Sequence, residues 1–130
     1  MFFIFYLPIF GPQGLGNNFR LGTGNTNSAT YPVLLNSLLH VRVTKVAVHS
    51  GGQHCLVLTS DGLVFSWGEG ADGRLGHGDT NCRELPEQVV SLPRGIVDVV
   101  AGGAHSAAIT ESVSILELIA PLHPISIHVV

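Results

Sequence analysis

The feature that most constrains this chain is an internal repeat that occupies its middle. Residues 14–38 align with residues 68–92 at an offset of 54, and 11 of these 25 positions are identical. A second block aligns Val46–His54 with Val97–His105 at an offset of 51, which places a deletion of three residues near Leu92–Ile96. A period of a little over fifty residues predicts similar structural units that stack, because one unit alone cannot bury its apolar faces.

Each unit has the pattern of short antiparallel strands. Apolar runs predict strands over 41–48, 54–59, 63–67 and 85–90. Asp61-Gly62 lies between two of these runs and predicts a tight hairpin of type I′, a turn that needs positive φ. Pro86 lies near the start of the last run and predicts an edge strand, where a missing N–H is tolerated. Without helical periodicity, the predicted fold class is all-β, a partial β-propeller of antiparallel four-stranded blades.

Composition excludes several classes of function. The chain has 130 residues and a mass of 13.7 kDa, which suits one small domain. It has a net charge of −3 and only six Lys and Arg residues, so we expect no direct nucleic-acid binding, which needs clustered cations. Two cysteines are too few for a disulfide-stapled mini-protein or for a zinc site of four cysteines.

Both ends of the chain are apolar, but neither has the pattern of a membrane span. Residues 1–10 are shorter than the ~20 residues that cross a bilayer, and they lack the basic region of a signal peptide. Residues 113–130 contain Pro121 and Pro124, which would break a membrane helix. We therefore expect no membrane partner and a cytoplasmic or nuclear location, where thiols stay reduced.

The repeat carries a signature of glycines, histidines and a tryptophan. Val-x-x-Gly-Gly-x-His, Asp-Gly-x-Val-x-x-Trp-Gly and Gly-x-Leu-Gly-x-Gly follow one another in the complete copy, and Gly-Gly-x-His recurs later. The signature positions are Gly51, Gly52, His54, Asp61, Gly62, Trp67, Gly68, Leu75, Gly76, Gly78, Gly102, Gly103 and His105. This cycle resembles the repeat of the regulator of chromosome condensation family, and especially the RCC-like domains of giant HECT-type ubiquitin ligases. The resemblance implies blades of a closed seven-bladed propeller.

The same signature divides the chain into a repeat region and two flanking segments. We expect an N-terminal segment over 1–13, a partial repeat over 14–43, a full repeat over 44–96, a partial repeat over 97–110 and a C-terminal tail over 111–130. Gln13 stands where Trp67 stands in the next copy, and Glu111–Ser114 replace the Asp-Gly turn. The flanking segments therefore look unrelated to the repeat, as in a truncated or mis-spliced reading frame.

Two motifs that can carry chemistry are interpreted as structural. Gly68–Gly73 has the G-x-G-x-x-G spacing, but the residues after it are too rich in glycine for the helix that a dinucleotide site needs. The seven histidines show no metal-binding spacing, so we expect no cofactor and no metal. His54 and His105 share one repeat position, which predicts a structural hydrogen bond within each blade.

The cysteines and the tryptophan are also expected to be structural. Cys55 starts an apolar strand and should be buried, whereas Cys82 lies in a polar loop and should be exposed. The resemblance implies that a HECT-type catalytic cysteine belongs to a separate domain. Trp67 ends a strand one residue before a glycine, a pattern typical of the core. We therefore expect no catalytic residue in this chain.

The loop over 68–81 is the candidate surface for a partner, because propeller loops display side chains on a rigid scaffold. Its charged residues are Glu69, Asp72, Arg74 and Asp79, with Arg83 close behind them.

The favoured interpretation is a non-catalytic protein-interaction module, resembling part of the RCC-like propeller of a HECT-type E3 ubiquitin ligase, that recruits substrates or partners in ubiquitination. One alternative is a guanine nucleotide exchange factor-like propeller for a small GTPase, which needs several blades. Another is a truncated remnant with no independent function. We expect protein partners of unspecified identity, and self-association through exposed blade edges.

Overall fold

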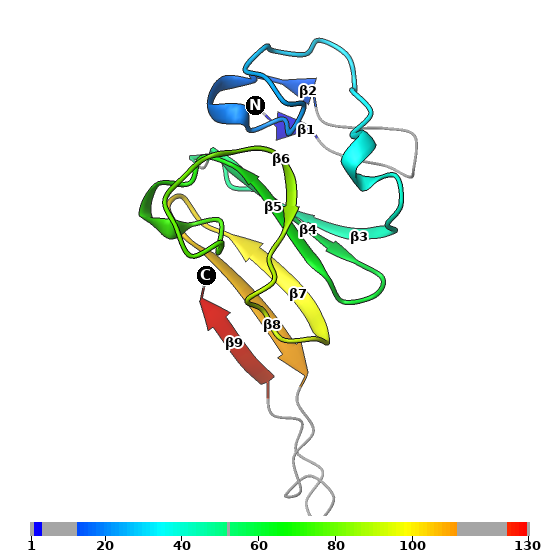
Figure 1. Cartoon of the computed structure of the whole chain (residues 1–130), viewed down its shortest axis with the longest axis vertical. Helices are drawn as coiled ribbons and strands as arrows, with labels where there is room; N and C mark the ends of the chain where they lie inside the picture. The colour runs from blue at the N-terminus through cyan, green and yellow to red at the C-terminus, as the bar shows by residue number, and fades with distance from the viewer. Residues whose placement is uncertain (1, 4–12, 52, 112–124, 130) are drawn as a thin grey trace, which may run out of the picture.

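Short strands joined by turns make up the computed structural model, which describes residues 2–3, 13–51, 53–111 and 125–129 (Figure 1). The strands are β1 (Phe2–Phe3), β2 (Gln13–Gly14), β3 (Val43–Ala47), β4 (His54–Thr59), β5 (Val64–Gly68), β6 (Arg83–Gln88), β7 (Ile96–Ala101), β8 (Ser106–Glu111) and β9 (Ile125–Val129). The 3₁₀ turns are η1 (Asn17–Phe19), η2 (Asn36–Leu38) and η3 (Ala71–Gly73). Within these ranges there is no α-helix, and no helix could cross a membrane. The signature residue Gly52 and most of the two flanking segments lie outside the described residues.

The strands form three antiparallel sheets. The middle sheet has the order β3-β4-β5-β6, the C-terminal sheet has the order β7-β8-β9, and β1 pairs with β2. The middle sheet is the four-stranded unit expected from the complete repeat, and Pro86 lies in its edge strand β6. The all-β prediction is therefore confirmed.

The hairpin between β4 and β5 forms where Asp61-Gly62 predicts it, but with another turn type. The Gly62 N–H donates to the Thr59 carbonyl over 3.0 Å, and Gly62 has a φ of +76°. Asp61 does not have the positive φ that a type I′ turn requires at both central positions. The type I′ prediction was wrong, because a longer turn that closes on Gly62 needs only one residue with positive φ.

The strand registers place the length difference between repeats at two positions rather than one. Val43 pairs with Thr59 as Ile96 pairs with Thr110, so β7 follows β3 by 53 residues while β8 follows β4 by 51. Two residues are therefore missing from the connection between β7 and β8, and one from the segment before β7. The single offset of 51 was wrong for the first strand of the unit, because sequence alignment favoured the shared glycines over the pairing register.

Described residues of both flanking segments occupy strand positions of the repeat. The pairing of Phe2 with Gly14 repeats the pairing of His54 with Gly68. β9 pairs with β8 in the place that β5 has beside β4. The sequence pattern assigns neither segment to the repeat, but strand pairing uses backbone groups and so does not require the signature side chains.

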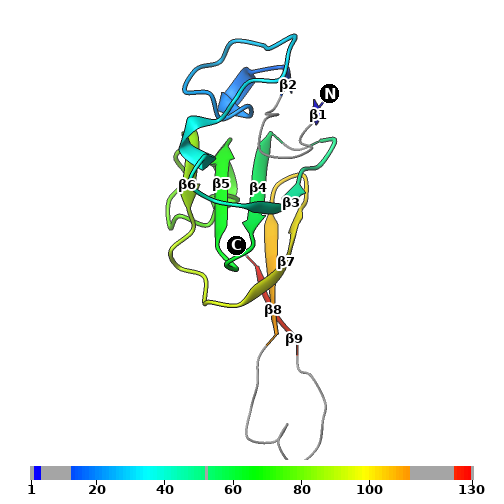
Figure 2. The same ribbon diagram turned by 90° about the vertical axis from the view of Figure 1, so that its right-hand side faces the viewer.

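Two apolar cores cover opposite faces of β4, which lies beside β7 in both views (Figures 1 and 2). The core toward the C-terminal sheet contains Leu56 and Leu58 of β4 together with Ala47, Val64, Val89, Ile96, Val99, Ala101 and Ala108. The core toward the first repeat contains Cys55 and Val57 of β4 together with Leu35, Leu38, Phe65 and Trp67. Alternate residues of one strand therefore bind the middle sheet to both of its neighbours.

Candidate interaction site

The loop between β5 and β6 has a backbone conformation that its sequence specifies. A Cβ atom on Gly70 would lie 1.9 Å from the Asn81 carbonyl oxygen, so this close approach of two backbone segments requires glycine. Asp72, at the centre of η3, has a φ of +60°. The loop of the first repeat has the same features, with Gly16 against Asn27 at 2.0 Å and Asn18 at a φ of +57°. The repeat therefore builds one loop shape twice.

Trp67 joins the middle sheet to the first repeat. Its side chain is fully buried, and its indole Nε1–H donates to the Arg20 carbonyl over 3.0 Å. A Cβ atom on Gly22 would lie 2.7 Å from that nitrogen, so the indole packs directly on the backbone of the preceding loop. The signature tryptophan and glycine thus form one contact between consecutive repeats.

His54 makes a structural hydrogen bond, but between sheets rather than within one. Its Nε2 lies 2.7 Å from Oγ of Ser106 on β8, and that hydroxyl donates in turn to the Arg74 carbonyl over 2.8 Å. Because the hydroxyl hydrogen is used, His54 donates from Nε2 and keeps Nδ1 unprotonated. Burial, reinforced by the positive charge of Arg74, lowers the pKa of His54 to about 4. The prediction of a bond within each blade was wrong, because the ring faces the next repeat.

The charged side chains of the predicted partner-binding loop are mostly held by contacts within the protein. The Arg74 guanidinium donates to the Ala71 carbonyl over 2.8 Å and, over 3.2 Å, to the carbonyl of Gly103 in the connection between β7 and β8. Glu69 accepts the Ala71 N–H over 3.0 Å. Asp72 contacts Arg74 at 3.1 Å, yet 70% of its side chain is exposed. Of Glu69, Asp72 and Arg74, Asp72 is therefore the most exposed to solvent.

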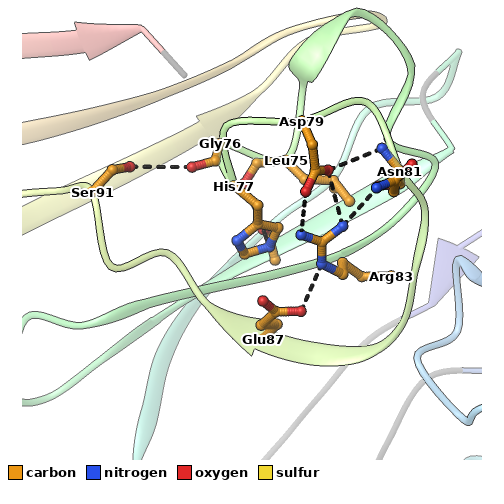
Figure 3. A network of polar contacts seen from close by, with 9 residues as sticks. Leu75, Gly76, His77, Asp79, Asn81, Arg83, Glu87 and Ser91 are labelled. Atoms are coloured by element: carbon orange, nitrogen blue, oxygen red, sulfur yellow. Dashed lines mark hydrogen bonds and ion pairs between the residues drawn. The ribbon is translucent and has the colours of Figure 1, made fainter.

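Asp79 belongs to a network centred on Arg83 (Figure 3). Arg83 donates to both oxygens of Asp79 over 3.0 and 2.9 Å, and to Glu87 Oε2 over 2.6 Å. The hydrogen bond from Arg83, followed by that from the Asn81 N–H, lowers the pKa of Asp79 to about 2. Sequence reasoning missed Glu87, although opposite charges spaced by four residues along 79–87 were a usable signal.

A hollow of about 330 Å³ lies beside this network, between the loop and β6. Its lining consists of Gly76, His77, Gly78, Glu87, Gln88, Val90 and Ser91. His77 also holds the loop onto the sheet, since its Nε2 lies 2.9 Å from Oγ of the buried Ser66. Burial lowers the pKa of His77. Sequence reasoning did not single out His77 or Val90, because their meeting depends on how the loop folds back.

The two cysteines differ in their surroundings. Cys55 is buried in β4, and burial raises the pKa of its thiol, which disfavours the nucleophilic thiolate. Cys82 is exposed, with its sulfur 3.6 Å from Glu69 Oε1. Across the described ranges, His, Cys, Asp and Glu side chains form no group of three or more that could hold a metal ion.

A family model for the regulator of chromosome condensation (RCC1) repeat matches residues 13–58 and 61–109, and a second model of that repeat matches residues 43–74. The chain belongs to the RCC1 repeat family. Its 99 matching residues are 56% identical to the E3 ubiquitin-protein ligase HERC2 of Homo sapiens and of Mus musculus, covering 75% of this chain but 2% of HERC2. It is 38% identical over 99 residues to the mitochondrial RCC1 domain-containing protein RUG3 of Arabidopsis thaliana, covering 75% of this chain and 22% of RUG3.

Solved RCC1-type structures share the fold. Human WBSCR16 superposes with a TM-score of 0.67 at 24% identity, over 76% of this chain and 25% of that protein. Yeast RCC1 (Prp20), solved bound to Kap60, superposes with a TM-score of 0.66 at 23% identity, over 76% of this chain and 25% of Prp20. The prediction of a partial β-propeller and the resemblance to RCC-like domains of ubiquitin ligases are both confirmed. The chain spans a small part of each of these relatives.

Proposed function

We propose that this RCC1 repeat segment is a non-catalytic protein-interaction module that recruits substrates or partners for ubiquitination in the cytoplasm or nucleus. The observation that carries the proposal is the 56% identity to an E3 ubiquitin-protein ligase, HERC2, over 99 residues. The family model matches residues 13–58 and 61–109 of the chain.

The geometry supports a binding role. Hydrogen bonds that join loops and sheets involve His54 Nε2, the hydroxyls of Ser66 and Ser106, and Trp67 Nε1–H, so these residues serve as framework. Exposed side chains such as Asp72 and Val90 lie on loops fixed by that framework. A rigid scaffold that displays loop residues is well suited to recognition, because little conformational entropy is lost on binding.

The test begins with direct binding. The full chain would be used to capture proteins from a cell extract, and each captured protein would then be purified and titrated against the chain by calorimetry. We expect at least one captured protein to bind the chain directly. Its affinity should fall when an exposed residue is substituted, as in Asp72→Lys, and it should carry fewer ubiquitin conjugates in cells that lack the chain. Absence of any direct binder, or unchanged ubiquitination of every binder, would contradict the proposal.

The exchange-factor alternative is addressed by a separate measurement. Likeness to Prp20 at 23% identity supports a common fold and nothing finer. Release of labelled nucleotide from a purified small GTPase is expected to proceed at the same rate with and without the chain. Acceleration by the chain would replace the recruitment proposal with the exchange-factor one.

A further inference from the structure

The hollow beside β6 differs from the rest of the loop in that the first repeat has other side chains at three of its lining positions. The first repeat builds the same loop with Thr23, Val33 and Asn36 at the positions of His77, Glu87 and Val90, at the repeat offset of 54. The left-handed residues Asn18 and Asp72 and the glycine contacts at Gly16 and Gly70 correspond in the two loops. The backbone shape of the loop therefore does not depend on the identity of the residues at these three positions, although His77 adds a hydrogen bond to the sheet in this copy.

Apart from Gln88, whose amide can also donate, the hydrogen-bonding side chains at the hollow offer acceptors. Ser66 Oγ donates to the Leu75 carbonyl over 2.7 Å, so it accepts from His77 Nε2–H, and the other ring nitrogen of His77 keeps a lone pair. Glu87 binds Arg83 through Oε2 and remains 52% exposed. The Ser91 hydroxyl donates to the Gly76 carbonyl over 3.1 Å (Figure 3). A ligand that brings hydrogen-bond donors can therefore pair with His77, Glu87 and Ser91.

The charge of the network points the same way. Arg83 is the single cation between two carboxylates, those of Asp79 and Glu87, so the three side chains carry a net negative charge. Val90 stands at the rim with 82% of its surface exposed, which provides an aliphatic contact beside the carboxylate. A donor cation on an aliphatic stem fits this pairing, since such a side chain buries its methylenes while its charged end stays with the carboxylate.

We propose that this hollow binds a lysine side chain of a partner protein, with the ammonium at Glu87 and the methylene stem along Val90. The inference rests on the proposed role as a protein-interaction module and names the chemistry that its partner brings. The hollow's volume of about 330 Å³ is at the lower end for ligand sites, in keeping with one side chain rather than a whole small molecule.

The test uses short peptides and the isotope-labelled full chain. Acetyl-Gly-Lys-Gly-amide is titrated while the amide resonances of Gly76, Gly78 and Ser91 are followed by NMR, and the norleucine peptide, which keeps the stem without the ammonium, is the matched ligand. We expect saturable shifts with a Kd on the order of millimolar for the lysine peptide, given its small contact area. The norleucine peptide is expected to bind at least tenfold more weakly. Equal binding of the two peptides, or no shift with lysine, overturns the proposal.

Two substitutions in the hollow and one outside it locate the binding. Glu87→Gln is expected to raise the Kd of the lysine peptide at least fivefold. Glu84→Gln, which neutralises another exposed carboxylate of β6, should leave this Kd unchanged. Val90→Asn introduces the residue of the first repeat at an exposed position, and we expect it to weaken binding about threefold, as expected for a lost apolar contact. Equal effects of Glu84→Gln and Glu87→Gln would show non-specific charge attraction and overturn the proposal.

The outcome is separable from that of the recruitment proposal. If direct binders from the extract retain their affinity for Glu87→Gln and the lysine peptide does not bind, the hollow is not the recognition site while recruitment stands. If no direct binder exists but the lysine peptide binds through Glu87, recruitment fails while the site itself is real.

Discussion

The middle sheet and the C-terminal sheet carry the same repeat positions in different surroundings. His54 is fully buried against Ser106, whereas His105, at the corresponding repeat position just before β8, is exposed. Leu58 is 5% exposed in the core between the sheets, whereas its counterpart Ile109 is half-buried on the outer face of β8. The difference shows that burial in this repeat is created by the next sheet along the chain rather than by the repeat unit itself.

The largest expected effect comes from shortening an apolar side chain in the core between the sheets, compared with the same change on the outer face of β8. Leu58→Ala should lower the free energy of unfolding by about 2–5 kcal/mol, because it leaves a cavity in a closed core. Ile109→Ala should cost less than about 1.5 kcal/mol, because the half-buried side chain gives up less contact. Urea unfolding followed by circular dichroism measures both. Equal losses of unfolding free energy would mean that the outer face of β8 is covered in solution, for example by self-association of the chain.

A second expected effect is a loss of folding stability in acid, caused by protonation of His54. Its pKa of about 4 in the folded protein lies below the unfolded value of 6.5, so the unfolded chain binds more protons between these values. The contribution of His54 to the free energy of unfolding is therefore fully present above pH 6.5 and is lost as the pH drops toward 4. The loss is up to about 3 kcal/mol, at ~1.4 kcal/mol per pKa unit.

The substitution His54→Gln isolates this contribution, because His77 also has a lowered pKa and acts in the same direction. Urea midpoints measured between pH 7 and pH 4 should change less in His54→Gln than in the wild type. The matched His105→Gln variant should keep the wild-type slope, since that ring is exposed. A flattened slope in His105→Gln instead would refute the assignment.

The smallest expected effect concerns the ion pair between the two sheets. Lys45 on β3 and Asp98 on β7 occupy the same repeat position and form a salt bridge, which lowers the pKa of Asp98. Their side chains are 44% and 39% exposed, so a double-mutant cycle with Lys45→Ala and Asp98→Ala should give a coupling below about 1 kcal/mol. The coupling should shrink in 1 M salt. A coupling that is larger and independent of salt would mean that this edge of the interface is closed to water.

Much of the fold was readable because it depends on local sequence. The strand runs, the Asp61-Gly62 hairpin and the edge position of Pro86 each follow from residues within a few positions of one another. The β9 pairing could not be read in this way. Its Ile-Ser-Ile-His-Val sequence is typical of a strand, but it does not indicate that β8 is the strand with which it pairs.

The candidate site was less predictable, because its contacts join distant residues. The charges of Glu69 and Arg74 suggested a binding surface, yet carbonyls and N–H groups of the folded loop and of Gly103 engage them. His54 was correctly read as a residue that makes a hydrogen bond, but its partner Ser106 lies 52 residues away. A pattern of charged residues does not show which of them the backbone will bind.

The unequal connections between paired strands have a consequence for the order in which the sheets form. Four residues separate β4 from β5, whereas thirteen separate β8 from β9. Loop closure for the longer connection costs about 1 kcal/mol more in entropy, since the cost grows with the logarithm of length. The hairpin of the middle sheet should therefore form early, and β9 should dock after β7 and β8 have met β4. Backbone amides of β4 and β5 should then gain protection from hydrogen exchange in a faster kinetic phase than those of β9.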